Sequence, residues 1–538
     1  MSMSINLYDY GSAFTFLHVL VIMFISFGIV HGDNPTTTFS VCSRAPYPKI
    51  CTYLIGKTSI ETPFDIRRTT LESTLAQAEK AYEHVSSMDL SSFEPRAKSA
   101  WADCLELYED SLYQLNRSLG STDSNDIQTW LSSVSTNHVT CQNGFHDFNL
   151  SSHYQTFHDS SLSGFSKYVS NSLAINKAIT PILTINPKQI KGRKLMMSTN
   201  NKFPTWLSKN DRKLLATPSS ATSADIVVAQ DGSGNYKTIS EAISAVSKLR
   251  KGSSRFTIHV KAGVYKENVE ISKTINNLMI FGDGIGSTVV TSSKNVQDGT
   301  TTFRSATFAV SGSGVIIKDM SFENTAGPAK HQAVAFRSGS DLSVVYNCAF
   351  KGYQDTLYVY SGRQFYRNCL IYGTEDFIFG NAAVVVQSCN IYVRKPLSGQ
   401  KNTITAQSRT DPNQNTGIVV HNSAIQADSD LKGSIGSVQS FLGRPWMQYS
   451  RTVFMKCSID GLIDPAGWLQ WSGSFALSTL YYGEYSNTGA GAGTGGRVKW
   501  PGYHVITSAS EASKFTVGAF LDGDSWISGT GLPYTSGL

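Results

Sequence analysis

The stretch NCAFKGYQDTLYVYSGRQFYRNCLIYGTEDFIFG, residues 347–380, contains two similar copies of one unit. Asn347-Cys348 opens the first copy and Asn368-Cys369 opens the second. An aspartate follows each cysteine after seven residues, Asp355 in the first copy and Asp376 in the second. A short internal repeat is typical of proteins in which each structural unit packs on the next. The two aspartates are therefore expected at equivalent places in neighbouring units.

Further copies of this unit extend to both sides. An apolar run, a polar residue, a small or sulfur-containing residue and a second apolar run recur between 315 and 461. The equivalent positions are Met320, Cys348, Cys369, Cys389, Ser423 and Cys457, with spacings of 28, 21, 20, 34 and 34 residues. Short runs of Val, Ile and Phe separated by Gly, Asn and Asp predict strands. Coils of this length predict a solenoid of parallel strands, a β-helix, because a sandwich or barrel would not stack like residues in register.

Stacked coils would bring Asp355 and Asp376 close together, because adjacent strands lie about 4.8 Å apart. Two carboxylates at that distance resist double ionisation, so one pKa rises unless a cation holds the other group ionised. Such a pair supplies a proton donor together with an ionised base or nucleophile. The alternative is that the two aspartates only cap turns of the solenoid.

Residues 34–185 show a helical pattern instead. Segments near 64–88, 101–119, 124–148 and 161–178 predict a four-helix bundle. The apolar stripe of the second segment consists of Trp101, Cys104, Tyr108, Leu112, Leu115 and Leu119, at three- and four-residue steps. Cys42 and Cys51 are close enough for a local disulfide, and Cys104 with Cys141 can join two helices. This half contains no cluster of His or carboxylates with ligand spacing.

The N-terminus carries features of export. The apolar run at 13–30 predicts a secretory signal peptide over 1–32. An uncleaved membrane anchor is the alternative, because no Lys or Arg precedes the run and its 18 residues are long for a signal peptide. The glycosylation motifs at Asn116 and Asn149 also fit a secreted protein.

A polar, basic segment at 186–216 separates the helical half from the strand-rich domain at 217–538. It contains the similar motifs RKLM at 193–196 and RKLL at 212–215. Exposed basic stretches in a weakly structured linker are preferred protease targets. The sequence therefore predicts a processing protease as a partner, and a merely solvated linker is the alternative.

Composition limits the classes of partner. With 41% hydrophobic and 16% charged residues, the chain is globular, and 538 residues favour two or more domains. The net charge of +6 lies mostly in residues 216–538, which hold 27 Lys and Arg against 22 Asp and Glu. This excess is too small to indicate nucleic acid binding, but it suits an acidic polymer.

Side chains suited to acyl transfer lie near the aspartate pair in the sequence. The amides of Gln332 and Gln354 can donate to a developing oxyanion. Arg444 in LGRPW is a cation that could keep one carboxylate ionised, and Trp446 and Phe379 offer flat surfaces for a sugar ring. The sequence contains no G-x-S-x-G elbow, and its histidines lack metal-ligand spacing.

Seven motifs resemble those of plant pectin methylesterases, over essentially all of 217–538. They are DIVVAQDGSGNYKTISEAI (225–243), AGVYKENV (262–269), TTFRSATF (301–308), SFENTAGPAKHQAVAFR (321–337), GYQDTLYVYSGRQFYR (352–367), GTEDFIFGNAAVV (373–385) and LGRPW (442–446). The helical half resembles the inhibitor-type pro-region of these enzymes. The resemblance implies a right-handed parallel β-helix preceded by an all-α bundle. It also implies the disulfides Cys42–Cys51, Cys104–Cys141 and Cys369–Cys389, although spacing alone allows Cys348–Cys369 equally.

The resemblance also implies residue roles. Asp376 would be the nucleophile that attacks the methyl ester of a galacturonate unit in pectin, and Asp355 the proton donor and base. Gln332 and Gln354 would stabilise the oxyanion, and Arg444 would hold Asp376. The residues expected to line the polymer groove are Thr302, Gln332, Phe379, Arg444, Trp446 and Trp468. No metal or cofactor is implied. We expect a secreted, monomeric cell-wall enzyme, with a proteinaceous pectinesterase inhibitor as a further partner.

One position departs from the family pattern. Glu375 stands where these enzymes usually have an aliphatic residue. Alternation along a strand predicts that its side chain points away from Asp376 and the substrate. A position near the pair would instead raise the pKa values of the carboxylates.

Two other functions remain as alternatives. Cleavage of the pectin chain would need either a carboxylate pair flanking a glycosidic bond or a calcium site with a basic residue. The set of Gln332, Gln354 and Arg444 suits neither. An inactive wall-binding or inhibitory module is the second alternative, and the filled catalytic positions argue against it.

Overall fold

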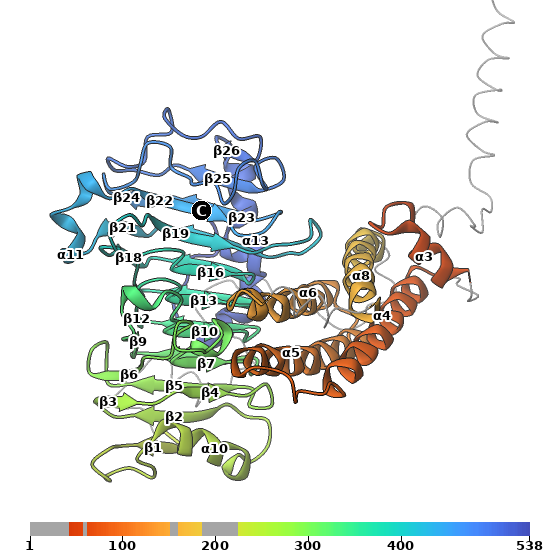
Figure 1. Ribbon diagram of the computed structural model, residues 1–538, viewed down its shortest axis with the longest axis horizontal. Helices are drawn as coiled ribbons and strands as arrows, with labels where there is room; N and C mark the ends of the chain where they lie inside the picture. Colours follow the sequence, from red (N-terminus) through yellow and green to blue (C-terminus); the bar gives the residue numbers. More distant parts are fainter. Residues whose placement is uncertain (1–41, 57–61, 151–159, 186–223) are drawn as a thin grey trace, which may run out of the picture.

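The computed structural model describes residues 42–56, 62–150, 160–185 and 224–538. The signal peptide and the basic linker predicted above lie outside these residues. Strands from 226 to 505 form three sheets in which all the described pairs are parallel (Figure 1). The predicted right-handed parallel β-helix is confirmed, and a group of helices precedes it.

Most coils contribute one strand to each of the three sheets. The first sheet contains β1 (Ile226–Val228), β2 (Phe256–Val260), β5 (Leu278–Gly282), β8 (Ile316–Lys318), β11 (Ser343–Tyr346), β14 (Arg363–Arg367), β17 (Ala383–Gln387), β20 (Gly417–His421), β23 (Arg451–Met455), β25 (Tyr481–Tyr485) and β26 (Tyr503–Val505). The second contains β3 (Gly263–Lys266), β6 (Thr288–Ser292), β9 (Ser321–Asn324), β12 (Ala349–Lys351), β15 (Leu370–Gly373), β18 (Asn390–Val393), β21 (Ala424–Ala427) and β24 (Ser458–Ile459). The third, called the groove sheet below, contains β4 (Val269–Ile271), β7 (Phe308–Val310), β10 (Phe336–Ser338), β13 (Leu357–Val359), β16 (Ile378–Gly380), β19 (Asn402–Gln407) and β22 (Ser440–Pro445).

A left-handed residue makes the tight turn between the first and second sheets in successive coils. The residues with positive φ at this turn are Asp319, Asn347, Asn368, Ser388, Asn422 and Lys456. Asn and Asp tolerate this conformation better than most residues, which explains their recurrence in the repeat. The next residue in each coil is one of the six equivalent positions of the repeat. The strands that follow pair in register, Ala349 with Leu370 and Leu370 with Asn390.

The stacked cysteines do not form the predicted bond. Cys348, Cys369, Cys389 and Cys457 are buried free thiols, so the expected Cys369–Cys389 disulfide is wrong. Each Sγ lies within hydrogen-bond reach of the carbonyl of the residue two positions earlier. Equivalent side chains in stacked coils point the same way rather than toward one another, so proximity of the coils is not sufficient for a bond.

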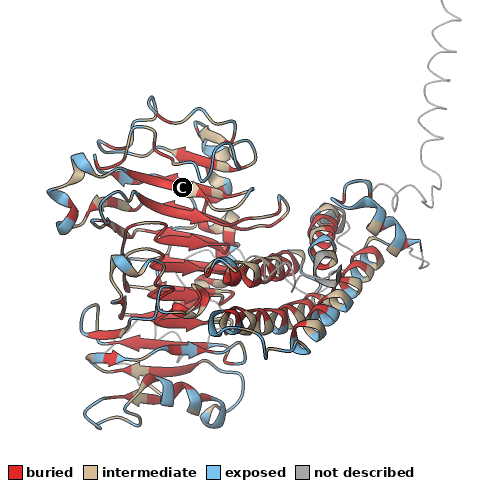
Figure 2. Cartoon of the chain, viewed as in Figure 1, coloured by how far each residue is buried: buried red, intermediate tan, exposed pale blue. Residues whose placement is uncertain are grey.

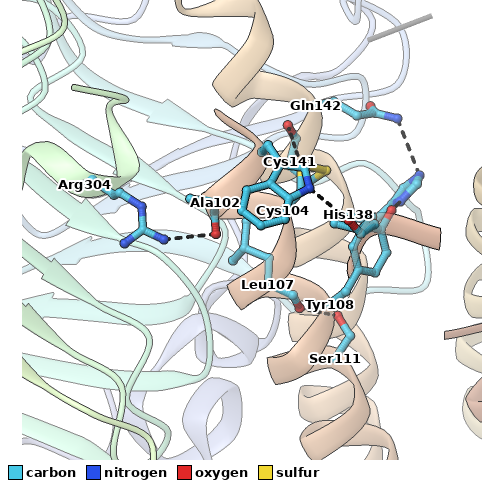
Figure 3. Close-up of a disulfide and its surroundings, with 11 residues drawn as sticks. Ala102, Cys104, Leu107, Tyr108, Ser111, His138, Cys141, Gln142 and Arg304 are labelled. Carbon is cyan, nitrogen blue, oxygen red and sulfur yellow. Dashed lines mark hydrogen bonds between the residues drawn. A yellow bond between two sulfur atoms is a disulfide. The ribbon is translucent and has the colours of Figure 1, made fainter. Parts of the chain in front are cut away.

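The helical half contains α3 (Pro48–Ile55), α4 (Pro63–Ser86), α5 (Pro95–Gly120), α6 (Ser124–His146) and α8 (Ser160–Ile185). Cys42–Cys51 and Cys104–Cys141 are bonded as predicted, and the second bond joins α5 to α6 (Figure 3). Cys104, Tyr108 and Leu115 of the predicted apolar stripe are buried between the helices. Figure 2 shows buried residues recurring along the long helices. The four long helices confirm the predicted bundle. None of the described helices is both long and apolar enough to cross a membrane.

The ends and surface of the β-helix carry short helices. These are α10 (Ile239–Leu249), α11 (Ser429–Lys432), α12 (Ala509–Ala512), α13 (Val517–Leu521) and α14 (Gly523–Trp526), with the 3-10 turns η3 (Phe303–Ser305), η4 (Pro328–Lys330), η5 (Ile435–Ser437), η6 (Ser513–Phe515) and η7 (Ser528–Thr530). Helix α10 lies at the N-terminal end of the stack, where it buries Ile239, Ile243 and Val246 (Figure 1). Helix α13 packs on β17, on the outer face of the first sheet.

Helices α5 and α6 lie against the face of the groove sheet (Figure 1). The indole Nε1 of Trp130 donates to Asp341 at 3.1 Å, and the hydroxyl of Tyr360 donates to Asn137 at 2.6 Å. Apolar side chains of the two halves form one continuous buried cluster, which includes Leu107 of α5 and Phe303 of η3. The helical half therefore covers the face that bears the two aspartates.

Candidate active site

Asp355 and Asp376 lie on consecutive coils of the groove sheet. Each stands two residues before its strand, β13 or β16, and these strands pair with Leu357 opposite Ile378. The two aspartates have φ angles of 62° and 52°. Such left-handed positions are energetically unfavourable for a non-glycine residue and are common at active sites. The turn directs both carboxyl groups into one cavity, where the residues are 8% and 5% exposed.

Three hydrogen-bond donors hold the carboxylate of Asp376. Arg444 of β22 donates from Nε at 2.8 Å and from Nη2 at 2.5 Å. Thr403 of β19 donates from its hydroxyl at 2.6 Å and accepts the backbone N–H of Asp376 at 2.9 Å. Charge-assisted bonds of this kind are short and strong, and together they fix the orientation of the carboxylate.

Asp355 lies in the opposite electrostatic environment. Burial is the main cause that raises its pKa well above the usual range, and the carboxylates of Asp376, Glu375 and Asp147 raise it further. Arg444 lowers the pKa, but by less. The two neighbouring carboxyl groups thus lie in contrasting surroundings, because Asp376 is bonded to a guanidinium whereas Asp355 is buried among negative charges.

The cavity has a volume of about 420 Å³ and contains side chains from both halves of the chain. The strand-rich half contributes Thr302, Phe303, Gln332, Gln354, Asp355, Tyr358, Glu375, Asp376, Phe379, Ala406, Arg444, Trp446 and Trp471. The helical half contributes Asp103, Thr140, Asn143, Gly144, His146, Asp147 and Asn149. All of the predicted catalytic residues meet here. Among the described residues, the Gln354 Oε1 atom is buried without a hydrogen-bond partner.

Aromatic rings form one wall of this cavity. Phe379 stacks on Tyr358 with ring centroids 4.2 Å apart, and Trp446 lies 6.0 Å from Phe379. The guanidinium of Arg444 lies 4.5 Å above the ring of Trp471. These rings could pack against the face of a sugar.

Trp468, which was expected in the groove, does not line the cavity. It is 1% exposed, stacks on Tyr482 and donates from Nε1 to Glu484 at 3.2 Å. The side chain that reaches the cavity is Trp471, three residues later. The sequence does not indicate which of these two nearby tryptophans lines the cavity. The choice depends on the backbone turn around Gly467 and Gly473, which both have positive φ.

The expectation that Glu375 points away from the substrate is also wrong. Its carboxylate lines the cavity and contacts Nη2 of Arg444 at 2.5 Å. Strand alternation fails here because Asp376 is left-handed and β16 begins only at Ile378. Glu375 and Asp376 therefore share a single guanidinium.

Asp147 at the end of α6 reaches into the cavity from the helical half. Its carboxylate accepts the backbone N–H of Thr302 at 2.8 Å. Burial raises the pKa of Asp147 to about 6, although the bond from Thr302 opposes the change. Neither Asp147 nor Thr403 belongs to a motif in the sequence, and only the folded arrangement brings them to the site.

The pectinesterase family model matches residues 225–524. The chain belongs to the pectinesterase family. A second model, described as plant invertase/pectin methylesterase inhibitor, matches residues 38–175. The chain is 51% identical to the probable pectinesterase/pectinesterase inhibitor 6 of Arabidopsis thaliana, over 92% of this chain and 93% of that protein. It is 48% identical to pectinesterase 2 of Citrus sinensis, over 97% and 99%.

Among solved structures, this pectinesterase is similar to the pectin methylesterase from carrot, with 59% identity and a TM-score of 0.58. The match covers 98% of the carrot chain but only 59% of this one. That share corresponds to the length of the β-helix without the helical half. The chain is thus a carboxylic ester hydrolase of the pectin methylesterase type, with an inhibitor-like domain at its N-terminal side.

Proposed function

We propose that this enzyme hydrolyses the methyl esters of galacturonate units in cell-wall pectin through an acyl-enzyme at Asp376. The observation that carries the proposal is the contrast between the two stacked carboxyl groups. Asp376 is held by Arg444 and Thr403, whereas burial and neighbouring negative charge raise the pKa of Asp355 well above its usual range. The coil that bears Asp376 thus supplies a nucleophile, and the neighbouring coil that bears Asp355 supplies an acid.

In the first step, an oxygen of Asp376 attacks the carbonyl carbon of the methyl ester. The tetrahedral oxyanion that forms accepts hydrogen bonds from the amides of Gln332 and Gln354, which line the cavity. As the carbon–oxygen bond to the methoxy group breaks, Asp355 gives its proton to that oxygen and methanol leaves. The galacturonyl group remains bound to Asp376 as an anhydride.

In the second step, the ionised Asp355 takes a proton from water, and the resulting hydroxide attacks the galacturonyl carbonyl. The bond to Asp376 breaks, and the nucleophile returns to its arginine-bound, ionised form. Asp355 keeps the proton that it took from water, and the new galacturonate carboxyl group releases its own proton to solvent. The polymer leaves with a carboxylate in place of the ester, and the same two carboxyl groups are ready for another unit.

The helical half is proposed to mask this site before processing. Helices α5 and α6 and the turn after α6 place seven residues in the catalytic cavity, and the carboxylate of Asp147 accepts the backbone N–H of Thr302. A polymer could not enter while these groups remain. We infer that the protein is exported as a masked precursor, cut at the basic linker by a processing protease, and acts in the wall as a monomer. A separate pectinesterase inhibitor could cover the same face after the cut.

Methanol release by the isolated 217–538 segment tests the proposed reaction. We expect methanol from highly methylated pectin, without new reducing ends or unsaturated products. Asp355→Asn should lower the rate by roughly 10²-fold or more, because the amide can neither give nor take the proton. Chain scission would indicate a depolymerising enzyme, and a folded but inert segment would indicate a binding module.

Glu375 gives a prediction for the pH profile. Its negative charge is one of the causes that raise the pKa of Asp355, so Glu375→Gln should lower that pKa. Asp355 must be protonated in the first step, so its ionisation limits kcat/KM on the alkaline side. We expect the alkaline limb of the profile to move to lower pH. An unchanged profile in a folded variant would mean that Arg444 fully screens the Glu375 charge.

A further inference from the structure

Arg304 has an unusual set of partners. It belongs to η3, next to Thr302 and Phe303, which line the catalytic cavity. Its guanidinium contacts Asp103 at 2.5 Å and Glu106 at 2.7 Å, both on α5. It also donates to the carbonyl of Ala102 on the same helix at 3.0 Å (Figure 3). Within the described residues, every contact recorded for this guanidinium comes from the helical half.

Arg363 provides a contrast on the same face. It also pairs with a helical carboxylate, Asp126, at 2.7 Å. However, it keeps bonds to Asp341 of its own half from Nε at 2.9 Å and from Nη2 at 2.7 Å. Removal of the helices would leave Arg363 paired and structural, but it would leave Arg304 without an acidic partner.

A row of carboxylates on α5 follows this surface. Asp103, Glu106 and Glu109 are spaced by three residues, which puts them on one side of the helix over roughly 9 Å. Glu109 pairs with Lys273, just after β4, at 3.3 Å. These three carboxylates, bound by Arg304 and Lys273, resemble the regularly spaced carboxylates of an acidic polysaccharide.

A second cavity continues the surface beside the catalytic one. Its volume is about 290 Å³, and Lys273 and Arg337 line it together with Phe303, which also lines the catalytic cavity. The guanidinium of Arg337 lies 3.6 Å over the Phe303 ring, and its buried Nε has no hydrogen-bond partner among the described residues. The strand-rich half thus contributes two cations, Lys273 and Arg337, and one carboxylate, Glu270 of β4, to this second cavity.

We propose that Arg304 and Lys273 bind the free carboxylates of de-esterified galacturonate units beside the catalytic cavity. In the uncut chain the carboxylates of α5 occupy this site. The proposal rests on the proposed function, because it assumes that a galacturonate polymer lies in the groove. A guanidinium binds carboxylates through paired donors, whereas a neutral methyl ester offers neither the charge nor the second strong acceptor. The site would thus recognise the product part of the polymer rather than the ester.

Calorimetric titration of the 217–538 segment tests this site. Every protein titrated, the wild-type reference included, carries Asp376→Asn, so that the esterified probe is bound but not hydrolysed. The match to the solved carrot chain supports the folding of this segment alone. The probes are a de-esterified oligogalacturonate and the same oligomer fully methyl-esterified. Arg304→Gln should weaken binding of the de-esterified probe by about 10-fold and of the esterified probe by less than about twofold. Lys273→Gln should give a smaller change in the same direction. Arg304→Lys should lie between wild type and the neutral variant.

Lys251→Gln is the matched control, because Lys251 is an exposed cation on the loop after α10, outside both cavities. It should bind both probes like wild type. The full chain with an uncleavable linker should bind the de-esterified probe far more weakly than the segment. Wild-type affinity in both Arg304→Gln and Lys273→Gln would overturn the proposal and leave these cations as contacts for the helical half only. Failure of the wild-type segment to release methanol would instead count against the proposed function.

Discussion

Asp376→Asn should reduce methanol release by more than roughly 10³-fold, because the amide keeps the shape of the side chain but loses the nucleophilic oxygen. This is the largest effect expected of a single substitution in the chain. The partners of Asp376, Arg444 and Thr403, remain in place, so the cavity should still bind polymer. The rate should be measured on the 217–538 segment, with the thermal unfolding midpoint recorded in parallel.

Asp341→Asn is a suitable control for the lost ion pair. Asp341 is also a buried carboxylate bonded to an arginine, Arg363, but it does not line the catalytic cavity. This variant should lose stability and keep turnover, whereas Asp376→Asn should lose turnover whether or not its stability changes. Near-normal methanol release by folded Asp376→Asn would contradict the proposed mechanism and indicate that both aspartates only cap turns.

Cutting the linker should produce the second large effect. A tethered domain acts at an effective concentration of about 1 mM, so even a contact of micromolar affinity would leave roughly one site in a thousand open. A chain with Arg193, Lys194, Arg212 and Lys213 replaced should therefore stay as a larger precursor with little wall activity. Insertion of a site for a specific protease into this linker should restore methanol release after cutting and dilution to nanomolar concentration.

N-terminal sequencing of the wall-extracted protein gives an independent check. We expect a major species that begins near 197 or 216, and the second start is favoured because it leaves less linker. Full activity in a wall protein that begins near 33 would show that the helices stay attached without masking the site. In that case the contacts that Asp147 and Arg304 make between the helical half and the strand-rich half would have to open during each catalytic cycle.

The repeat in the sequence carried most of the information about the fold. Six equivalent positions, from Met320 to Cys457, predicted the register of the coils because a parallel stack places like residues above one another. The same register predicts that Asp355 and Asp376 lie on neighbouring coils, one above the other. Arg444, Gln332 and Gln354 were recognisable because their chemistry suits a carboxylate pair and an oxyanion.

The remaining site residues depend on local backbone geometry that no pattern encodes. Glu375 turned inward because the left-handed Asp376 interrupts the alternation of the strand, and Trp471 reached the cavity in place of Trp468 because of the turns around it. Thr403 lies on the next coil and enters no motif. The predicted disulfide between stacked cysteines is wrong, because a short distance between two backbones does not determine the direction of the two sulfur atoms.

The place of the two aspartates within the stack has a consequence for how the enzyme loses activity. In the groove sheet, β13 and β16 are central strands, with three neighbours toward one end and two toward the other. A solenoid opens from its termini, because an end coil has a neighbour on one side only. Partial melting would first expose α10 with β1 at one end or β26 at the other. On warming, the two ends of the β-helix should therefore unfold at a lower temperature than the central coils that bear the catalytic aspartates.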